Sequence, residues 1–276
     1  MGTMHKWTLQ DELRLTPINL SRAALCFARD IAYPGLNIGY YLDLLTGLAE
    51  SARALIFKTD PLAIQAELLA SFLFKELGFR GNQADYADWR NSFLNEVLDR
   101  RLGIPITLSA IYLEIARQLD IPAEGVSLPG HFIVSVWDGE RTHYFDPFHG
   151  GGRLSVNDCA LLVQHTTGYH GPFQVAWLSA TNPRDILIRM LNNLRIHTLQ
   201  RERWLDAAKV MICLIAVQAD FPEHLRDLGL LYYRLGEFPR ASHYLDEYLR
   251  RQPNAPDAEL LRQTVDKTLT QWASLN

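Results

Sequence analysis

The hydrophobic residues of this chain change their spacing along the sequence, and that change limits the folds available to it. Between residues 18 and 119, most apolar residues recur three and four positions apart, as in amphipathic helices. From residue 124 to residue 145 they alternate as in strands, and Asp138-Gly139 is a typical hairpin turn. We expect Gly150-Gly151-Gly152 to end this β region. Helices followed by a small antiparallel sheet predict an α+β fold.

The segment from residue 107 to residue 119 predicts the most deeply buried helix. Its apolar residues lie almost all round the helix, which is typical of a helix at the centre of a core. Gly103-Ile104-Pro105 separates it from a short helix predicted for residues 92–101. The buried helix is therefore expected to begin near Pro105.

The C-terminal third is helical again and contains a repeat. Small and apolar residues there match the tetratricopeptide spacing, at Leu225, Leu228, Gly229, Tyr232, Gly236, Ala241, Leu245 and Pro253. One period upstream, Arg195 stands at the glycine position, so the first repeat is degenerate. Residues 257–275 can supply a capping helix. Two repeats and a cap are short for a solenoid, so we expect this all-α module to pack against the first domain.

The composition excludes several classes of function. A chain of 276 residues with a net charge of −4 and no dense Lys/Arg stripe indicates no nucleic-acid partner. The three cysteines are scattered and form no CxxC pair, which fits a reducing cytoplasm. No apolar run approaches the length of a membrane span, and no signal peptide is recognised. We expect a cytoplasmic protein with no membrane partner and no cofactor; the sequence does not specify its oligomeric state.

His131 and Asp146 stand out as candidates for a base and its orienting acid. They flank two alternating runs joined by the turn at residues 138–139, so neighbouring strands would bring their side chains within hydrogen-bond reach. A cysteine hydrolase would also need a thiolate at the start of the preceding helix, where Pro105 offers no nucleophile. Each residue also has a purely structural interpretation. A histidine can simply follow a Pro-Gly turn, and Asp-Pro commonly opens a turn.

Three motifs resemble the bacterial SirB-type family. They are Asn91-Ser-Phe-Leu-Asn95-Glu-Val-Leu-Asp-Arg100-Arg101-Leu-Gly103-Ile-Pro105-Ile-Thr107-Leu-Ser109, Gly125-Val-Ser-Leu-Pro129-Gly130-His131-Phe132 and Asp146-Pro147-Phe148-His149-Gly150-Gly151. The resemblance extends over roughly residues 18–255. It implies a transglutaminase-like (papain-like) core followed by tetratricopeptide repeats.

The resemblance also implies roles for single positions. Gly103-Ile104-Pro105 is similar to the Gly-Val-Cys of the nucleophile turn in active transglutaminase-like enzymes, so Pro105 occupies the cysteine position. His131 and Asp146 fall on the histidine and aspartate positions. We therefore divide the chain into an N-terminal tail (1–17), a transglutaminase-like domain with a helical N-terminal extension (18–180) and a tetratricopeptide-like domain (181–276).

Two catalytic alternatives stay open. Thr107 or Ser109 would act as a weaker hydroxyl nucleophile with His131 and Asp146, although serine and threonine routinely satisfy amides at a helix N-terminus. A metal-assisted site would instead gather the side chains of His131, His143, Asp146 and His149 around one cation. The spacing of these four residues matches no tight metal signature, so we predict no metal.

Several further residues are candidates for binding. Asn91 and Arg101, with Asn95 and Arg100, precede the vacant nucleophile position; they would line the cleft or bind an anionic group, or they lie on a solvated helix face. In the repeat module, Tyr and Arg side chains suit a concave binding surface, at Arg226, Tyr233 and Arg234.

The sequence thus favours a pseudoenzyme with a relic His131–Asp146 pair. Its predicted role is protein–protein interaction or regulation, with a protein or peptide bound by the tetratricopeptide module. The competing hypothesis is a hydrolase or acyltransferase that uses Thr107 or Ser109, or a metal-assisted variant.

Overall fold

The N-terminal part of the protein is helical, as the spacing predicted. The computed structural model describes residues 7–275. This part comprises α1 (Leu9–Leu13), α2 (Leu20–Ile31), α3 (Ile38–Arg53), α4 (Leu62–Ser71), the π-helix η1 (Phe72–Glu76), β1 (Arg80–Gly81), the 3-10 helix η2 (Trp89–Ser92), α5 (Leu94–Arg100) and β2 (Leu102–Gly103). Strands β1 and β2 pair in parallel, although η2 and α5 lie between them in the sequence.

The central part is an α-helix followed by an antiparallel sheet. Its elements are α6 (Pro105–Gln118), β3 (Ala123–Val126), β4 (Ile133–Trp137), β5 (Thr142–Asp146), β6 (Gly152–Leu154), α7 (Val156–Thr167), the 3-10 helix η3 (Val175–Leu178) and β7 (Ala180–Thr181). The strand order in space is β6-β5-β4-β3-β7, and every neighbouring pair is antiparallel. The predicted α+β class is confirmed.

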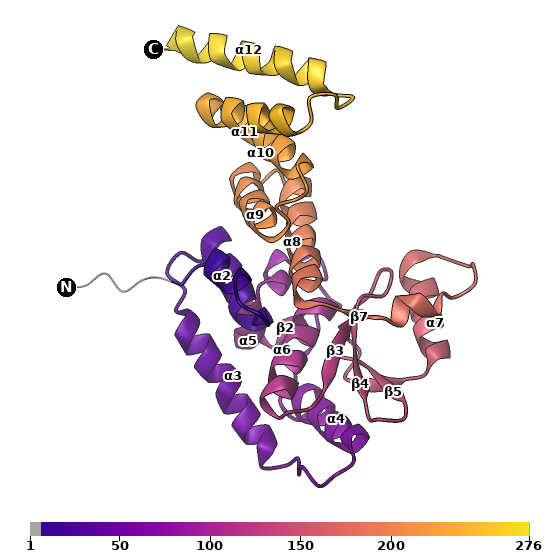
Figure 1. Ribbon diagram of the computed structural model, residues 1–276. Helices are drawn as coiled ribbons and strands as arrows, with labels where there is room; N and C mark the ends of the chain where they lie inside the picture. The colour runs from indigo at the N-terminus through magenta and orange to yellow at the C-terminus, as the bar shows by residue number, and fades with distance from the viewer. Residues whose placement is uncertain (1–6, 276) are drawn as a thin grey trace, which may run out of the picture.

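Helix α6 lies at the centre of the core, in agreement with the prediction from its all-round hydrophobicity. Eleven of its residues are buried, and the hydroxyl of Tyr112 donates a hydrogen bond to the backbone oxygen of Ala66 in α4 at 3.1 Å. The helix packs against β3 and β4 (Figure 1). Pro105 is its first residue, a position where proline loses no helical hydrogen bond.

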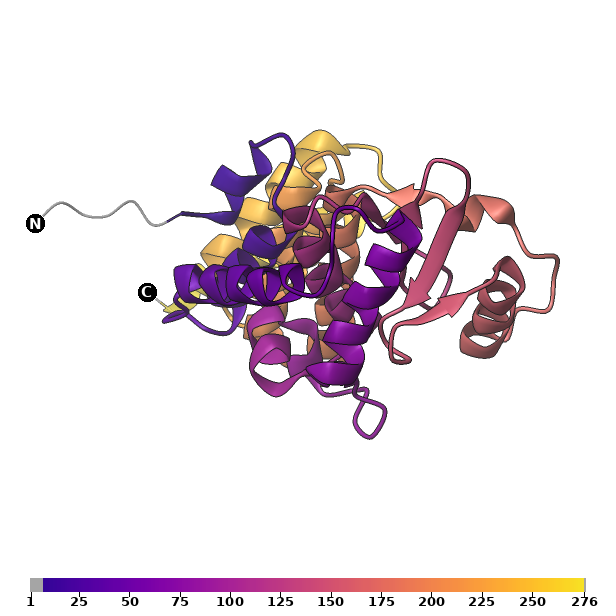
Figure 2. The same ribbon diagram turned by 90° about the horizontal axis from the view of Figure 1, so that it is seen from below.

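The sheet stands between two hydrophobic layers. On one face, Val134 and Val136 of β4 join the main core that contains α6; on the other, Ile133 packs with Cys159 and Val163 of α7. Figure 2 shows the strands between the N-terminal helices and α7. Because β4 is covered on both faces, its sequence is a nearly continuous apolar run.

The expected end of the β region at the three glycines was wrong. The chain reverses there, and β6 begins at Gly152, which pairs with Asp146. Gly150 and Gly151 both have positive φ, and a side chain at Gly151 would collide with the ring of Phe74. The glycines therefore form a tight turn between two strands, and β7 adds a further short strand beside β3.

The C-terminal part is a stack of antiparallel helices that extends away from the sheet domain (Figure 1). It comprises α8 (Pro183–Gln200), α9 (Trp204–Val217), α10 (Glu223–Arg234), α11 (Phe238–Arg251) and α12 (Ala258–Leu275). A Cβ atom at Gly229 of α10 would lie 2.7 Å from Leu245 Cγ of α11, so the small residue allows the two helices to cross closely. Helix α12 packs on α11, in the position predicted for a cap.

This helical stack also packs against the N-terminal helices. Helices α8 and α9 contact α2, and the Lys209 ammonium donates a hydrogen bond to the backbone oxygen of Ile31 at 2.9 Å. The segment that we assigned to an N-terminal tail contains α1, which also contacts α9. Glu12 of α1 is fully buried and accepts a hydrogen bond from the backbone amide of Asn19 at 2.7 Å. Contacts from α1 and α2 therefore hold the module.

Candidate functional site

The His131–Asp146 pair is formed by two neighbouring strands. His131 lies just before β4 and Asp146 is the last residue of β5, so the antiparallel pairing places them at the same end of the hairpin. The Nε2 atom of His131 lies 3.0 Å from Oδ1 of Asp146, and each side chain is only 4% exposed. The structure thus brings together the two residues that the sequence singled out.

His149 is a third member of this site. Its Nδ1 lies 2.6 Å from Oδ2 of Asp146, and its ring stacks on that of His131 with centroids 5.5 Å apart and an interplanar angle of 16°. In contrast to the other two side chains, that of His149 is 48% exposed. Among the described residues, one ligand atom from each of these three side chains lies within 4.8 Å of the other two.

The Asp146 carboxylate is surrounded by donors. The backbone amides of Phe148 and His149 both approach Oδ1, at 3.0 and 3.4 Å, in addition to the two imidazoles. Burial raises the pKa of the Asp146 carboxyl, but the hydrogen bonds and charges of His131 and His149 outweigh burial, and the net pKa is lowered. Asp146 is therefore ionised at neutral pH.

His143 does not belong to this site, which corrects the four-ligand metal alternative. It lies at the other end of the same hairpin, and its ring nitrogens contact Asp138 and Arg153. Because Arg153 can only donate, Nδ1 of His143 accepts and Nε2 donates to Asp138. Its side chain has no exposed surface. Both ring nitrogens are used within the protein.

The two candidate hydroxyls differ in their surroundings. The Thr107 hydroxyl donates to the backbone oxygen of Asn91 at 2.8 Å and accepts from the backbone amide of Ile104 at 3.1 Å. It therefore fastens the start of α6, the structural role that serine and threonine commonly have there. The Ser109 hydroxyl is buried and has no hydrogen-bond partner among the described residues. Within residues 7–267, the ring of His131 hydrogen-bonds to Asp146 and to no hydroxyl group.

The cysteines offer no replacement nucleophile. Cys26, Cys159 and Cys213 are all buried, and burial raises the pKa of each thiol to about 12. At neutral pH these thiols are protonated and enclosed. Pro105, which occupies the predicted nucleophile position, is itself buried at the first turn of α6.

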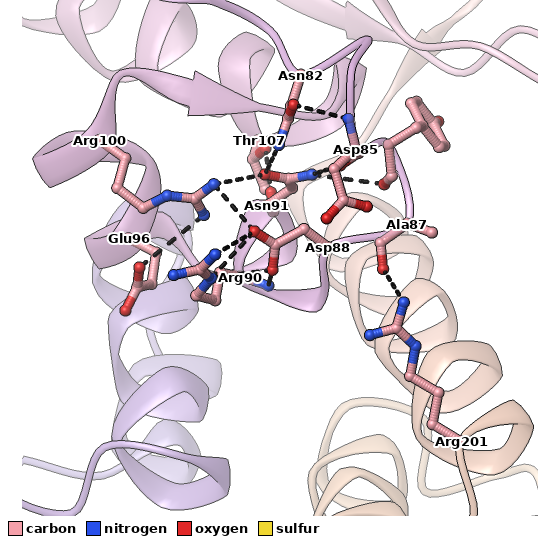
Figure 3. Close-up of polar contacts among 11 residues, drawn as sticks. Asn82, Asp85, Ala87, Asp88, Arg90, Asn91, Glu96, Arg100, Thr107 and Arg201 are labelled. Carbon is pink, nitrogen blue, oxygen red and sulfur yellow. Dashed lines mark hydrogen bonds and ion pairs between the residues drawn. The ribbon is translucent and has the colours of Figure 1, made fainter.

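Asn91 is the centre of a hydrogen-bond network next to the start of α6 (Figure 3). It is fully buried; its amide donates to the backbone oxygen of Asp85 at 2.9 Å and accepts from Asn82 at 3.1 Å. Its own backbone oxygen receives the Thr107 hydroxyl. The polar groups of Asn91 are thus engaged inside the protein, where they tie the loop before η2 to α6.

Charged residues extend this hydrogen-bond network. Arg100 donates to the Asp88 carboxylate at 3.0 Å. Burial raises the pKa of the Asp88 carboxyl. The hydrogen bonds to Arg90 and the charge of Arg100 lower this pKa by more, so the net pKa is below its usual value. Arg101 points elsewhere and donates to the backbone oxygen of Leu77 at 2.6 Å. The structure therefore gives Arg100 and Arg101 partners within the framework.

The three candidate residues of the repeat module have separate surroundings. Arg226 pairs with Asp227 at 2.8 Å and Asp257 at 3.2 Å, whereas the Tyr233 ring packs beside Phe238. Arg234 lies over the Trp204 ring, 3.8 Å from its centroid. Of the three, only Arg234 borders a groove of about 270 Å³, which is lined by Arg195, Leu199, Trp204, Met211, Asp227, Leu230, Leu231 and Arg234.

Two family models match consecutive parts of the chain. The family model described as "Transglutaminase-like superfamily" matches residues 40–192, and that described as "Tetratricopeptide repeat" matches residues 194–266. No helix that the structure describes has the length and hydropathy needed to cross a lipid bilayer.

Similar proteins occur in bacteria and in animals. A protein of Xylella fastidiosa named UPF0162 protein is 35% identical, with 92% of this chain and 90% of that protein covered. One of the same name from Vibrio cholerae is 31% identical, with 82% and 83% covered. Mouse F-box only protein 21 is 33% identical over 63% of this chain but only 28% of its own length.

Proposed function

The chain belongs to the transglutaminase-like superfamily, and since Pro105 stands where an active member would carry its cysteine, we propose that it is a non-catalytic protein-interaction or regulatory protein of the SirB type. The observation that carries the proposal is the lack, among the described residues, of any thiol or hydroxyl hydrogen-bonded to His131. A base without a nucleophile cannot form an acyl-enzyme. We place its action in the cytoplasm.

Binding is assigned to the groove between α8, α9 and α10. Leu199 and Leu230 are each 39% exposed at this groove, so it presents apolar surface to solvent. Arg195 and Arg234 lie at the same groove, and the nearest oxygen of Asp227 is 3.9 Å from Arg195, which is a weak contact. The groove therefore suits a peptide segment that carries an apolar anchor and a carboxylate.

One observation favours a second candidate function. The buried hydroxyl of Ser109 has no hydrogen-bond partner among the described residues, whereas that of Thr107 bonds to the backbone of Asn91 and Ile104. Buried polar groups without partners are uncommon in native proteins. A hydrolase or acyltransferase would accordingly use Ser109, with His131 as base and Asp146 as orienting acid.

The catalytic question is tested with an activated-ester acyl probe that reacts with nucleophilic thiols and with activated serine hydroxyls. We expect no labelling of wild type, labelling of a Pro105→Cys variant, and loss of that labelling in Pro105→Cys/His131→Ala. Acylation of wild type that disappears in both Ser109→Ala and His131→Ala would instead establish the enzyme. The melting temperature of every variant should be measured so that loss of fold is not read as loss of chemistry.

The binding role is tested with peptides selected from a random display library on the wild-type protein. Affinities of the selected peptides are then compared for wild type, Leu230→Asp in the groove, and Leu205→Asp, which is exposed on α9 and does not line the groove. We expect Leu230→Asp to weaken binding at least about tenfold, as for a central anchor, and Leu205→Asp to leave it unchanged. Equal affinities for all three proteins would contradict the assignment to the groove.

A further inference from the structure

We propose that His131, Asp146 and His149 bind one divalent transition-metal ion, for which zinc is the best match. Two imidazoles and one carboxylate form a set of ligands that zinc uses in proteins. The ligand atoms of the three side chains already lie within 4.8 Å of one another. This inference goes beyond the proposed function, because neither the peptide groove nor the vacant nucleophile position requires a metal.

The distances suit a small ion. In a tetrahedral zinc site with bonds of 2.0–2.2 Å, neighbouring ligand atoms are roughly 3.3 Å apart. The carboxylate oxygens of Asp146 lie 3.0 Å from Nε2 of His131 and 2.6 Å from Nδ1 of His149. The two contacts use different oxygens of Asp146, and to reach this spacing the contact with His131 would open by about 0.3 Å and that with His149 by about 0.7 Å.

Two of the three ligands are held firmly by the fold. Asp146 is fixed by the backbone amides of Phe148 and His149, both of which approach Oδ1 and leave Oδ2 to face the His149 ring. The loop that carries His131 is fixed by Arg189, which donates to the backbone oxygen of His131 at 2.7 Å. A prepared carboxylate and a buried imidazole reduce the cost of ordering the ligands.

The third ligand provides access. His149 is half-exposed and borders two cavities, of about 390 and 570 Å³. Its ring can therefore rotate outward to admit an ion, and solvent in these cavities can supply a fourth ligand. Zinc sites with three protein ligands commonly keep such an open position.

Metal binding would fix the tautomer of each imidazole. A ligating nitrogen must carry a lone pair, so the ring proton would reside on Nδ1 of His131 and on Nε2 of His149. With neutral imidazoles and the ionised Asp146, the site carries one negative charge, and the complex would carry one positive charge. Nitrogen ligands favour zinc, cobalt or iron over magnesium and calcium, which prefer oxygen.

The test is calorimetric titration of the full, untagged, chelator-treated chain with Zn²⁺. We compare wild type with His149→Asn and with His165→Asn, a matched control because His165 is exposed and lines one of the same cavities without belonging to the cluster. We expect one ion per chain for wild type and for His165→Asn. His149→Asn should bind at least about 100-fold more weakly, the upper end of the effect of removing an outer-shell partner.

Co²⁺ gives an independent readout of the coordination geometry. Wild type should develop the intense visible absorption of a four-coordinate Co²⁺ centre, and His149→Asn should not. The simpler interpretation is that His149 only adds a second hydrogen bond to Asp146; it predicts no stoichiometric binding, or equal binding by wild type and His149→Asn. Either result overturns the proposal, as does equal loss in His165→Asn. Leu230→Asp should retain zinc, so failure of the peptide groove is distinguishable from failure of the metal site.

Discussion

Two histidine–aspartate pairs lie at opposite ends of the β4–β5 hairpin, and their surroundings differ. At the turn, His143 contacts Asp138 and Arg153 and is fully enclosed. At the other end, His131 shares Asp146 with a second histidine, and that histidine is open to solvent. The first pair has no ring nitrogen left for chemistry, whereas the second adjoins two cavities. Residue type and burial are therefore poor guides to a functional histidine; the partners of each ring nitrogen distinguish the two.

The largest effect should come from removing the carboxylate of the deeper pair. Asp146→Ala leaves two imidazoles and two backbone amides without their acceptor, and we expect the free energy of unfolding to fall by about 3–5 kcal/mol. Asp138→Ala, at the partly exposed turn, should lower the free energy of unfolding clearly less than Asp146→Ala does. Urea denaturation measures both. Equal losses of unfolding free energy in the two variants would contradict the difference between the two ends of the hairpin.

The turn that carries His149 should be the next most sensitive feature. Gly151→Ala combines positive φ with a collision against Phe74, and we expect a loss of about 2–4 kcal/mol. Gly150→Ala is the matched control, because it has positive φ but open space around it, and should cost about 1–2 kcal/mol. Thermal unfolding of the two variants distinguishes them. A larger loss for Gly150→Ala would contradict the packing of this turn.

The turn pair, His143 and Asp138 at the β4–β5 turn, should affect how the stability of the protein depends on pH. Its hydrogen bonds with His143 and the backbone amides of Arg141 and Glu140 hold the pKa of Asp138 well below its usual range. A carboxyl with a lowered folded-state pKa stabilises the protein above its unfolded pKa, near 3.9, and this contribution is lost as the pH falls toward the folded value.

Denaturation midpoints between pH 6 and pH 2 test this expectation. The slope below about pH 4 should be shallower for Asp138→Asn than for wild type. Asp43→Asn, at an exposed position on α3, should leave it unchanged. An unaltered slope in Asp138→Asn would show that the turn pair contributes nothing to acid sensitivity.

The smallest effect should come from the exposed histidine. His149→Asn is expected to lower the free energy of unfolding by about 0.5 kcal/mol, since a half-exposed side chain loses one hydrogen bond that water can replace. His143→Asn should cost about 2 kcal/mol, because it leaves buried partners unsatisfied. The same urea measurements apply. A severe loss in His149→Asn would mean that His149 is a structural residue like His143.

Much of the fold follows from local patterns. The change of hydrophobic spacing predicts the α+β class. The small residues at the repeat positions, such as Gly229 and Ala241, predict the tetratricopeptide module. The edges of the sheet do not follow in this way. Strand β7 has only two residues, too few to show an alternating pattern, and β6 begins within a run of glycines that resembles the end of a β region. Short edge strands exist because a neighbouring strand offers hydrogen bonds, which is not a property of their own sequence.

The candidate site also has features that the sequence predicted and features that it did not. The order of His131 and Asp146 around a hairpin turn was enough to place them together, since antiparallel neighbours return to the same end. Asn91 was read as a possible ligand contact, yet its side chain is fully enclosed by Asn82, Asp85 and Arg100 (Figure 3). A sequence shows that such a side chain can form hydrogen bonds, but not which groups will satisfy them.

The sequence by itself determined the order of the helical and sheet regions, the position of the buried helix and the proline at its first turn, because these depend on spacing along the chain. Only the tertiary structure decided that His149 joins His131 while His143 does not, and that Thr107 is occupied by Asn91 and Ile104. The reason is physical. Periodicity is a local property, whereas the partner of a ring nitrogen or a hydroxyl depends on strand register and on loops that approach from distant parts of the chain.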